Sequence, residues 1–319
     1  MRAVGADELI ASLDSPSLIA ALADAFREGV VTPLRHHHTL SRPGEPDAVL
    51  LMMPAWSIGE AADAYIGVKL VTVVPGNAAR GVASVQGSYV LMSGLTGEPL
   101  AILDGTTLTL LRTAAASALA ARSLARADAA RLVMIGAGAM APHLIAAHAS
   151  VRPIREVVIW NRDRAKAEAL AARLAGRGYS VTAADDLDAA VASADIVSAA
   201  TMSRQPLVRG RFLKPGTHVD LVGAYTPEMR ESDDAAVARA RVFVDTREGA
   251  THEAGDIVQP LNNGTLTLDR IEADLFDFAH GRHPGRGSDD EITLFKSVGT
   301  ALEDLAAARL AWERLKPPA

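Results

Sequence analysis

A glycine-rich turn between an apolar run and a helix-forming segment constrains this chain most. Residues 132–135 are apolar, Gly136-Ala137-Gly138-Ala139-Met140-Ala141 follows them, and the next segment is rich in alanine with helical spacing. This order predicts a strand, a tight turn and a helix. Gly136 allows the backbone angles of such a turn, Gly138 lets a pyrophosphate approach the main chain, and a helix N-terminus offers free N–H groups to phosphates. We interpret the turn as a dinucleotide-binding motif; a tight turn that holds no ligand is the alternative.

A second apolar run, residues 157–160, follows at the spacing of one βαβ unit and ends in Asn161-Arg162. Enzymes that use NAD normally place an acidic residue here to bind the ribose 2′-hydroxyl, whereas an arginine suits a 2′-phosphate. The sequence therefore predicts that NADP(H) is preferred over NAD(H).

The rest of the chain separates into a β-rich part and an alternating part. After a helix over residues 15–27, strands are expected without βαβ alternation, and a helix over residues 106–126 leads to the glycine turn. Beyond the turn, strands alternate with helices, which predicts a doubly wound parallel sheet. Residues 255–268 look like loop and turn, residues 280–291 like a polar linker, and the last segment like a strand that becomes an amphipathic helix. The expected strands are residues 30–40, 48–56, 65–74, 84–92 and 99–103, and then 180–183, 195–200, 218–223 and 242–245.

Composition excludes several functions. With 319 residues, of which 49% are hydrophobic and 22% charged, the chain is expected to form about two domains with sizeable cores. A net charge of −6 and dispersed arginines argue against nucleic-acid binding. The absence of cysteine excludes disulfides, thiol catalysis and thiolate metal sites. No apolar run reaches membrane-spanning length and the first residues lack the apolar core of a signal peptide, so we expect a soluble cytoplasmic protein with no membrane partner.

Two cations stand in apolar surroundings. Lys69 lies within an apolar strand and Arg112 near the start of an apolar helix. A buried cation requires an anionic partner, although a long side chain that reaches solvent is the alternative for each. His36, His37 and His38 share a strand, in which His36 and His38 face one side. We expect them to be solvated or packing residues, with catalysis by one of them as the alternative, and we expect no metal site because no carboxylates accompany them.

At this point the motifs carry a family resemblance over nearly the whole chain. The runs 68–77, 103–121 and 295–308, together with the GAGAMA turn and the WNR end of the second strand, resemble the ornithine cyclodeaminase and mu-crystallin family. The resemblance implies a homodimer with two domains. A discontinuous α+β domain, residues 1–115 completed by a C-terminal helix over 298–319, would build the substrate site and the dimer interface. A Rossmann domain, residues 116–297, would bind the nicotinamide cofactor.

The same resemblance implies roles for individual residues. Lys69 and Arg112 match the family's cations for the substrate carboxylate, and Arg35 matches a third cation at that site. Lys69, or a water that it holds, is also the candidate for protonating the substrate nitrogen. The expected cofactor contacts are Gly136, Gly138, Ala139, Met140, Asn161, Arg162, Thr201, Met202, Ser203, Lys296, Ser297 and Gly299.

One position departs from the ornithine cyclodeaminases. Where those enzymes have an Asp that acts on the substrate amine or the attacking water, this chain has Tyr225. A phenol with an ordinary pKa of about 10 is a poor base at neutral pH. Tyr225 therefore favours hydride transfer alone over cyclodeamination. The surrounding segment is similar to that of Δ1-pyrroline-2-carboxylate and Δ1-piperideine-2-carboxylate reductases. The predicted reaction is therefore NADPH-dependent reduction of these cyclic imino acids to proline and pipecolate. The alternatives are an ornithine cyclodeaminase, an alanine dehydrogenase and a non-enzymatic binder like mu-crystallin.

Overall fold

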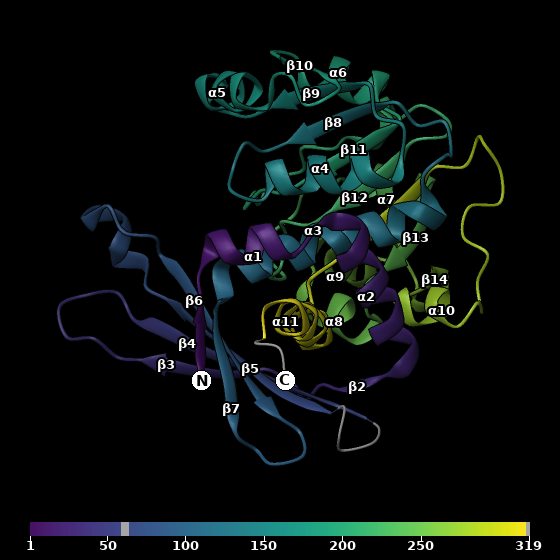
Figure 1. Ribbon diagram of the computed structural model, residues 1–319. Helices are drawn as coiled ribbons and strands as arrows, with labels where there is room; N and C mark the ends of the chain where they lie inside the picture. Colours follow the sequence, from purple (N-terminus) through teal and green to yellow (C-terminus); the bar gives the residue numbers. More distant parts are fainter. Residues whose placement is uncertain (59–63, 317–319) are drawn as a thin grey trace. The chain divides into compact units, whose positions relative to one another are not determined.

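The computed structural model describes residues 1–58 and 64–316 and contains two compact units (Figure 1). Unit 1 comprises Met1–Arg112 and Thr300–Ala319, and unit 2 comprises Thr113–Gly299. Helix α3 (Gly105–Leu124) passes from one unit into the other. The expected α/β class is confirmed.

Unit 1 is built on a seven-stranded sheet in the order β1-β7-β6-β5-β4-β2, with β3 paired to β4. All pairs are antiparallel except β1 with β7. The strands are β1 (Arg2–Val4), β2 (Val30–Val31), β3 (His36–Leu40), β4 (Ala48–Ser57), β5 (Tyr65–Val73), β6 (Val85–Ser93) and β7 (Pro99–Asp104). The helices are α1 (Ala6–Ser12), α2 (Ser15–Glu28) and α11 (Ala301–Leu315), with a 3-10 helix η2 (Pro75–Arg80).

The two faces of this sheet differ. Helix α11 packs on β4, β5 and β6, and α1 and α2 pack against α11. Gly67 and Lys69 of β5 are buried and pair with Leu91 and Tyr89 of β6. Because side chains alternate along a strand, the intervening residues point to the opposite face. That face is apolar: it carries Met52, Pro54, Trp56, Ile66, Val68, Leu70, Val90, Met92 and Ile102.

Unit 2 is an eight-stranded sheet in the order β10-β9-β8-β11-β12-β15-β13-β14, and every pair in it is parallel. Figure 1 shows β10, β9, β8, β11 and β12 side by side in this order. The strands are β8 (Arg131–Ile135), β9 (Glu156–Trp160), β10 (Ser180–Ala183), β11 (Ile196–Ala199), β12 (His218–Leu221), β13 (Arg241–Val244), β14 (Ile271–Ala273) and β15 (Thr293–Lys296). The helices are α4 (Ala141–Val151), α5 (Arg164–Leu174), α6 (Leu187–Ser193), α7 (Asp234–Arg239), α8 (Arg247–Glu253), α9 (Gly255–Asn263) and α10 (Leu275–Ala279), with 3-10 helices η3 (Gly210–Phe212) and η4 (Leu268–Arg270).

The strand order explains where a ligand can bind in unit 2. Strand β8 lies at the centre, and the chain proceeds from it first to β9 on one side and later to β11 on the other. Ligands of such sheets bind outside the carboxyl ends of the strands, at the point where the order reverses. The glycine turn follows β8 and therefore lies at that point. The predicted doubly wound parallel sheet is confirmed.

Two local expectations were wrong. Residues 255–263 form helix α9 rather than a loop, with Pro260 inside it. The proline and the flanking glycines suggested a break, but the helix is held by burial of Ile257 and by Asp256, whose buried carboxylate accepts hydrogen bonds from the N–H groups of Glu231 and Ser232. Residues 30–40 form two short strands, β2 and β3, instead of one. Pro33 lies between them and has no N–H to continue the ladder.

Within residues 1–58 and 64–316, no single helix is long and apolar enough to cross a bilayer. Helices α1 and α2, which are bent by 83° relative to each other, reach that length and apolar composition only when taken together.

Candidate functional site

The glycine turn after β8 has the backbone shape of a phosphate-binding loop. Gly136 adopts a φ of +105°, and a Cβ added to it would lie 2.8 Å from the carbonyl oxygen of Ala200. Its N–H donates to the carbonyl of Trp160 at 2.8 Å. Gly138, in contrast, is exposed and has nothing within 4 Å of an added Cβ. Gly136 is therefore required for the turn, and the main chain at Gly138 is open to a ligand.

Helix α4 begins directly after this turn. Met140 is its N-cap residue and supplies no side-chain hydrogen bond to the first turn. Ala139 is exposed and Met140 is half-buried. Within the first turn, Ala141 N and His143 N donate to Gly138 O and Met140 O at 3.2 and 3.1 Å, and Pro142 has no N–H. What the helix offers an anion here is therefore the positive end of its dipole, next to the exposed main chain of the turn.

Asn161 and Arg162, at the end of β9, lie next to the glycine turn in different roles. The Asn161 side chain accepts a hydrogen bond from Ala137 N at 3.3 Å and donates to Asp163 O at 2.8 Å. Arg162 is exposed and forms no hydrogen bond or ion pair with any residue that the structure describes. Arg164, by comparison, is paired with Glu168 and Asp185. Asn161 therefore fixes the turn, and Arg162 has its donors available for an added phosphate.

The loops after β11 and β12 are tied together by Glu231, which sequence reasoning missed. Its carboxylate accepts hydrogen bonds from Thr201 N and Oγ1 at 2.7 and 2.8 Å, and from Gly223 N at 2.7 Å. A Cβ on Gly223 would lie 1.9 Å from Thr201 O, so only glycine allows the loops to approach this closely. Burial raises the pKa of Glu231 to about 7. Met202, next to Thr201, is 74% exposed, and Ser203 donates to the carbonyl of Gln205.

Strand β15 ends at Lys296, and Ser297 and Gly299 come directly after it. Lys296 is completely buried, its ammonium donates to Leu221 O at 3.1 Å, and it lies 4.0 Å from Asp256. Ser297 is buried, and Gly299 N donates to Asp245 Oδ2 at 2.7 Å. Asp256 in turn accepts from the N–H groups of Glu231 and Ser232. We call Glu231, Asp256 and Lys296 the loop cluster. The structure places Lys296 within this cluster, beneath the loop backbone.

Unit 1 contains a second group of buried charges. The ammonium of Lys69 lies 2.6 Å from Asp304 Oδ2. The guanidinium of Arg112 contacts Asp304 Oδ1 at 2.9 Å and Glu303 Oε2 at 2.6 Å. Lys69 and Arg112 are 3% and 5% exposed, and both carboxylates are fully buried. We call these four residues the charge quartet. The structure thus brings the two predicted cations together through one shared carboxylate.

The pKa values of the quartet residues shift in different directions. Burial lowers the pKa of Lys69 to about 8, against the opposing attraction of Asp304. Burial also disfavours the charged guanidinium of Arg112, but Asp304 and Glu303 outweigh it and hold the pKa of Arg112 above its usual range. For Asp304, burial is outweighed by Lys69 and Arg112, and the pKa of this carboxyl lies below its usual range. Lys69 and Arg112 are therefore both protonated at neutral pH, each in contact with a buried carboxylate.

Arg35 and the three histidines lie in the segment that contains β3. Arg35 is half-buried, and its charge contributes to lowering the pKa of Lys69. His36, His37 and His38 are exposed, with the rings of His36 and His38 stacked at 6.4 Å. Among the described residues no group of His, Asp and Glu is arranged to hold a metal ion.

Glu303, Asp304 and Tyr89 are the site residues that the sequence did not reveal. Two acids in the apolar stretch ALEDLAAA were the available signal, because acids on a buried helix face require cationic partners. Tyr89 lies opposite Lys69 in the β5–β6 register and is 1% exposed. Its hydroxyl lies over Gly67, where an added Cβ would be 1.9 Å away, and it has no hydrogen-bond partner among the residues described.

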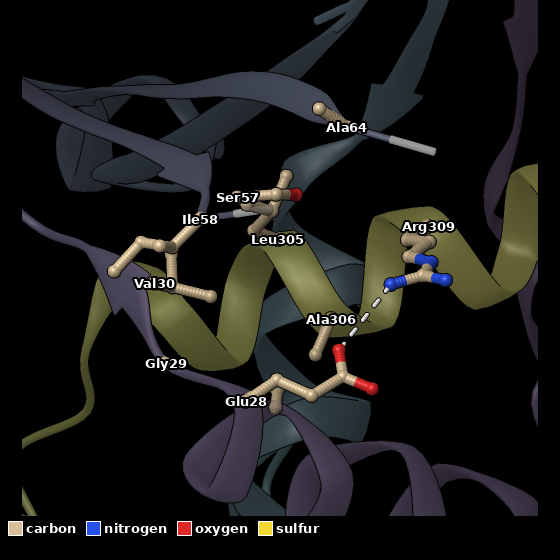
Figure 2. Close-up of a pocket in the computed structure, with 10 residues that line it drawn as sticks. Glu28, Gly29, Val30, Ser57, Ile58, Ala64, Leu305, Ala306 and Arg309 are labelled. Atoms are coloured by element: carbon tan, nitrogen blue, oxygen red, sulfur yellow. Dashed lines mark ion pairs between the residues drawn. The ribbon is translucent and has the colours of Figure 1, made fainter. Parts of the chain in front are cut away.

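A separate cavity of about 310 Å³ lies in unit 1 (Figure 2). In Figure 2 the guanidinium of Arg309 points toward the carboxylate of Glu28, at 3.7 Å. Apolar side chains that include Val30, Ile58 and Leu305 also line the cavity. No member of the charge quartet lines this cavity. Its cation is already paired with acids, so we do not assign it to the substrate.

Comparison with known proteins gives a consistent result. The sequence profile of the ornithine cyclodeaminase/mu-crystallin family matches residues 7–317. A Δ1-pyrroline-2-carboxylate reductase of Paracoccus denitrificans is 41% identical over 286 residues, which cover 87% of this chain and 89% of that protein. The structure of the Thermococcus litoralis Δ1-pyrroline-2-carboxylate reductase in complex with NADH and L-proline is similar with a TM-score of 0.91 and 32% identity, covering 98% of this chain and 97% of the other. An archaeal alanine dehydrogenase dimer with bound NAD has a TM-score of 0.88 and 30% identity, covering 98% and 95%.

Proposed function

This chain belongs to the ornithine cyclodeaminase/mu-crystallin family, and we propose that it reduces cyclic α-imino acids with NADPH, Δ1-pyrroline-2-carboxylate to proline and Δ1-piperideine-2-carboxylate to pipecolate. The observation that carries this proposal is the charge quartet, in which Lys69 and Arg112 are fixed as buried cations. Buried cations of this kind suit a small carboxylate ligand, which Arg112 binds through its guanidinium and Lys69 as a point charge.

The residues of unit 1 would bind and orient the substrate, and Lys69, or a water that it holds, is the candidate for protonating the imine nitrogen. Lys69 and Arg112, with Arg35 beside them, would hold the carboxylate and thereby orient the ring. When bound, the reduced nicotinamide would supply a hydride to the carbon of the protonated imine, whose nitrogen would take the electron pair of the C=N bond and keep its proton as the amine. Orientation of this kind accounts for a large share of the rate when the reacting atoms are held close together.

Tyr225 supports a reductase over a cyclodeaminase. Its side chain is 44% exposed in the loop after β12, where the cyclodeaminases have their Asp. A phenol at this position offers no carboxylate base for the attacking water. We therefore propose that hydride transfer is the complete reaction.

The cofactor preference rests on Arg162. Its side chain is exposed beside the glycine turn, unpaired within the described part of the chain, and the position carries no acid that would bind a ribose hydroxyl. A charge-assisted contact with a 2′-phosphate contributes about 1.5–3 kcal/mol. We expect the efficiency with NADPH to exceed that with NADH, and Arg162→Ala to lower it by about tenfold to a hundredfold while NADH is unaffected. Arg177→Ala, an exposed arginine of the same unit, is the matched control. Equal efficiency with both cofactors in the unmodified protein would contradict the preference.

The apolar face of the unit 1 sheet supports a homodimer. Trp56 and Ile102 on this face are 39% and 37% exposed, and the helices of unit 1 that the structure describes pack on the other face. Contiguous exposed apolar surface of this kind marks an interface, and a second copy of the same face would cover it. A monomeric mass by light scattering at micromolar concentration would contradict the dimer.

One assay tests the reaction. NADPH oxidation is followed with the two cyclic imino acids and, in parallel, with pyruvate plus ammonia. We expect turnover with the cyclic imines and far less with pyruvate. Ornithine should give neither proline nor ammonia. Efficient turnover of ornithine, without NADPH oxidation by the imines, would replace the reductase by the lyase.

A further inference from the structure

The cavity of Figure 2 combines an apolar lining with one acid and one cation. We propose that it binds a small aliphatic α-amino acid, with the ammonium at Glu28, the carboxylate at Arg309 and the side chain among the apolar residues. This site is additional to the proposed reaction and does not depend on it, because no residue assigned to the imino acid or to the cofactor lines the cavity. The apolar lining residues are Ala25, Val30, Ile58, Ala64, Leu305 and Ala306.

The cavity is formed where the end of α2 meets α11. Glu28 is the last residue of α2, and Val30 begins β2. Leu305 and Arg309 are four residues apart on α11 and therefore lie on the same face of that helix. Ile58 is 60% exposed, so a ligand side chain in the cavity would cover it. The volume of about 310 Å³ suffices for a small ligand, because small-molecule sites begin at roughly 300 Å³.

Arg309 has donors left for a ligand carboxylate. Its Nε donates to Glu313 at 2.8 Å, and its Nη1 lies 3.7 Å from Glu28, which is too long for a hydrogen bond. Neither Nη atom donates a hydrogen bond to any residue that the structure describes. A guanidinium binds a carboxylate best through two N–H groups, and the two Nη atoms of Arg309 offer such a pair.

Glu28 supplies the opposite charge. Its side chain is 63% exposed, and its one ion pair within the described part of the chain is the long contact with Arg309. An exposed pair at such a distance contributes little to stability, so both side chains can turn toward a ligand at little cost. An α-amino acid carries its ammonium and its carboxylate on one carbon. The two groups can therefore reach Glu28 and Arg309 at the same time, because these residues are neighbours.

The surrounding charges disfavour a ligand with a carboxylate alone. Glu28 and Arg309 also line an adjoining hollow of about 390 Å³ between α2 and α11, together with Asp24 and Glu313. Among the described lining residues of the cavity and this hollow, these three acids accompany a single cation, Arg309. A fatty acid would add to the excess of negative charge, and a simple amine would leave the Nη atoms of Arg309 without an acceptor. An α-amino acid satisfies both groups.

The test compares three ligands with the same branched chain. L-Leucine carries both charges, 4-methylpentanoate lacks the ammonium, and 3-methylbutylamine lacks the carboxylate. Their dissociation constants are measured by titration calorimetry with the full-length protein. We expect L-leucine to bind at least about tenfold more tightly than either of the other two, because each of them lacks one charge-assisted contact.

Three variants locate the site. Arg309→Gln and Glu28→Gln each remove one charged partner and should weaken L-leucine binding by about tenfold. Ala25→Leu keeps both charges but fills part of the cavity, so it should weaken L-leucine by at least a similar factor; leucine favours helix, and α2 should still form. Arg314→Gln makes the same change in charge as Arg309→Gln at another exposed position of α11 and should leave the constant unaltered.

Several results would overturn the inference. Binding of either singly charged ligand as tight as that of L-leucine would do so, as would no heat of binding with L-leucine at millimolar concentration. L-Leucine that keeps its affinity in Arg309→Gln and loses it in Arg112→Ala occupies the charge quartet instead. If one of the three variants does not fold, as judged by circular dichroism, the other two decide. None of these measurements involves NADPH oxidation, so failure of the reductase assay would leave this inference intact, and the reverse also holds.

Discussion

Two buried charge clusters, one in each unit, use a lysine on a strand in opposite ways. In the charge quartet, Lys69 pairs with a carboxylate at 2.6 Å, and that carboxylate also holds Arg112. In the loop cluster, Lys296 donates to a backbone carbonyl and its nearest carboxylate, on Asp256, is 4.0 Å away.

The partners of the carboxylates explain the difference. In the quartet they accept from side-chain cations, whereas in the loop cluster Glu231 and Asp256 accept mainly from backbone N–H groups. We propose that the first arrangement holds charges for the substrate carboxylate; the second fixes the path of the main chain beside the glycine turn. Burial alone therefore does not identify a ligand-binding lysine. The partners of the ammonium also matter: a side-chain carboxylate for Lys69, and a backbone carbonyl for Lys296.

The largest effect is expected from removing the carboxylate that both quartet cations share. Asp304→Ala leaves Lys69 and Arg112 buried with one acid between them, and breaking a buried pair costs about 3–5 kcal/mol. We expect the free energy of unfolding in urea to fall by that amount. Asp128→Ala, which removes an exposed acid paired with Arg126, is the control and should have little effect. A loss below about 1 kcal/mol in Asp304→Ala would show that the quartet is open to solvent.

Variants of the two clusters should affect different ligands: a variant of the charge quartet the imino acid, and a variant of the loop cluster the cofactor. Arg112→Ala should raise KM for Δ1-pyrroline-2-carboxylate by the equivalent of about 2–5 kcal/mol, because a charged partner of the substrate is lost from a desolvated site. The dissociation constant of NADPH should stay nearly unchanged. Glu231→Gln is the counterpart: it disturbs the loops at Thr201 and Gly223 and should weaken NADPH more than the imino acid. The reverse pattern in either variant would contradict the assignment of the clusters.

Much of this molecule follows from local sequence, and the rest depends on contacts between distant residues. The glycine turn and the parallel sheet follow from local spacing. Spacing also places Lys69 and Arg112 in apolar surroundings, but their assignment to the substrate comes from the family resemblance. The anions that complete the quartet do not, because Glu303 and Asp304 are about 190 residues from Arg112 and meet it only through tertiary packing. Glu231 could not be identified from the sequence for the same reason. The N–H groups that donate to it belong to Thr201 and Gly223, which lie after two neighbouring strands.

The loop cluster predicts a pH dependence of stability. Burial raises the pKa of Glu231 to about 7 from its ordinary value of 4.5. Between these values the folded protein keeps a proton that the unfolded chain releases, so stability falls as pH rises through this window, by at most about 1.4 kcal/mol per pH unit. Glu231→Gln cannot titrate, so it should lose that part of the slope. Melting temperatures of both proteins from pH 4.5 to 7 measure it, and parallel curves would contradict a raised pKa.

The quartet predicts a pH dependence of activity with a different origin. Burial lowers the pKa of Lys69 to about 8, so its ammonium, and with it one of the two carboxylate-binding charges, is lost as pH rises through that value. Since kcat/KM reports the free enzyme, it should fall by about tenfold per pH unit above pH 8. The imine substrate also loses its proton at high pH and would give a similar decline, and Lys69→Arg separates the two causes. Its guanidinium stays charged, so a decline that belongs to Lys69 should disappear from the profile even though the altered geometry lowers the rate throughout. A decline at the same pH in Lys69→Arg would assign the titration to the substrate and show that the quartet keeps Lys69 protonated.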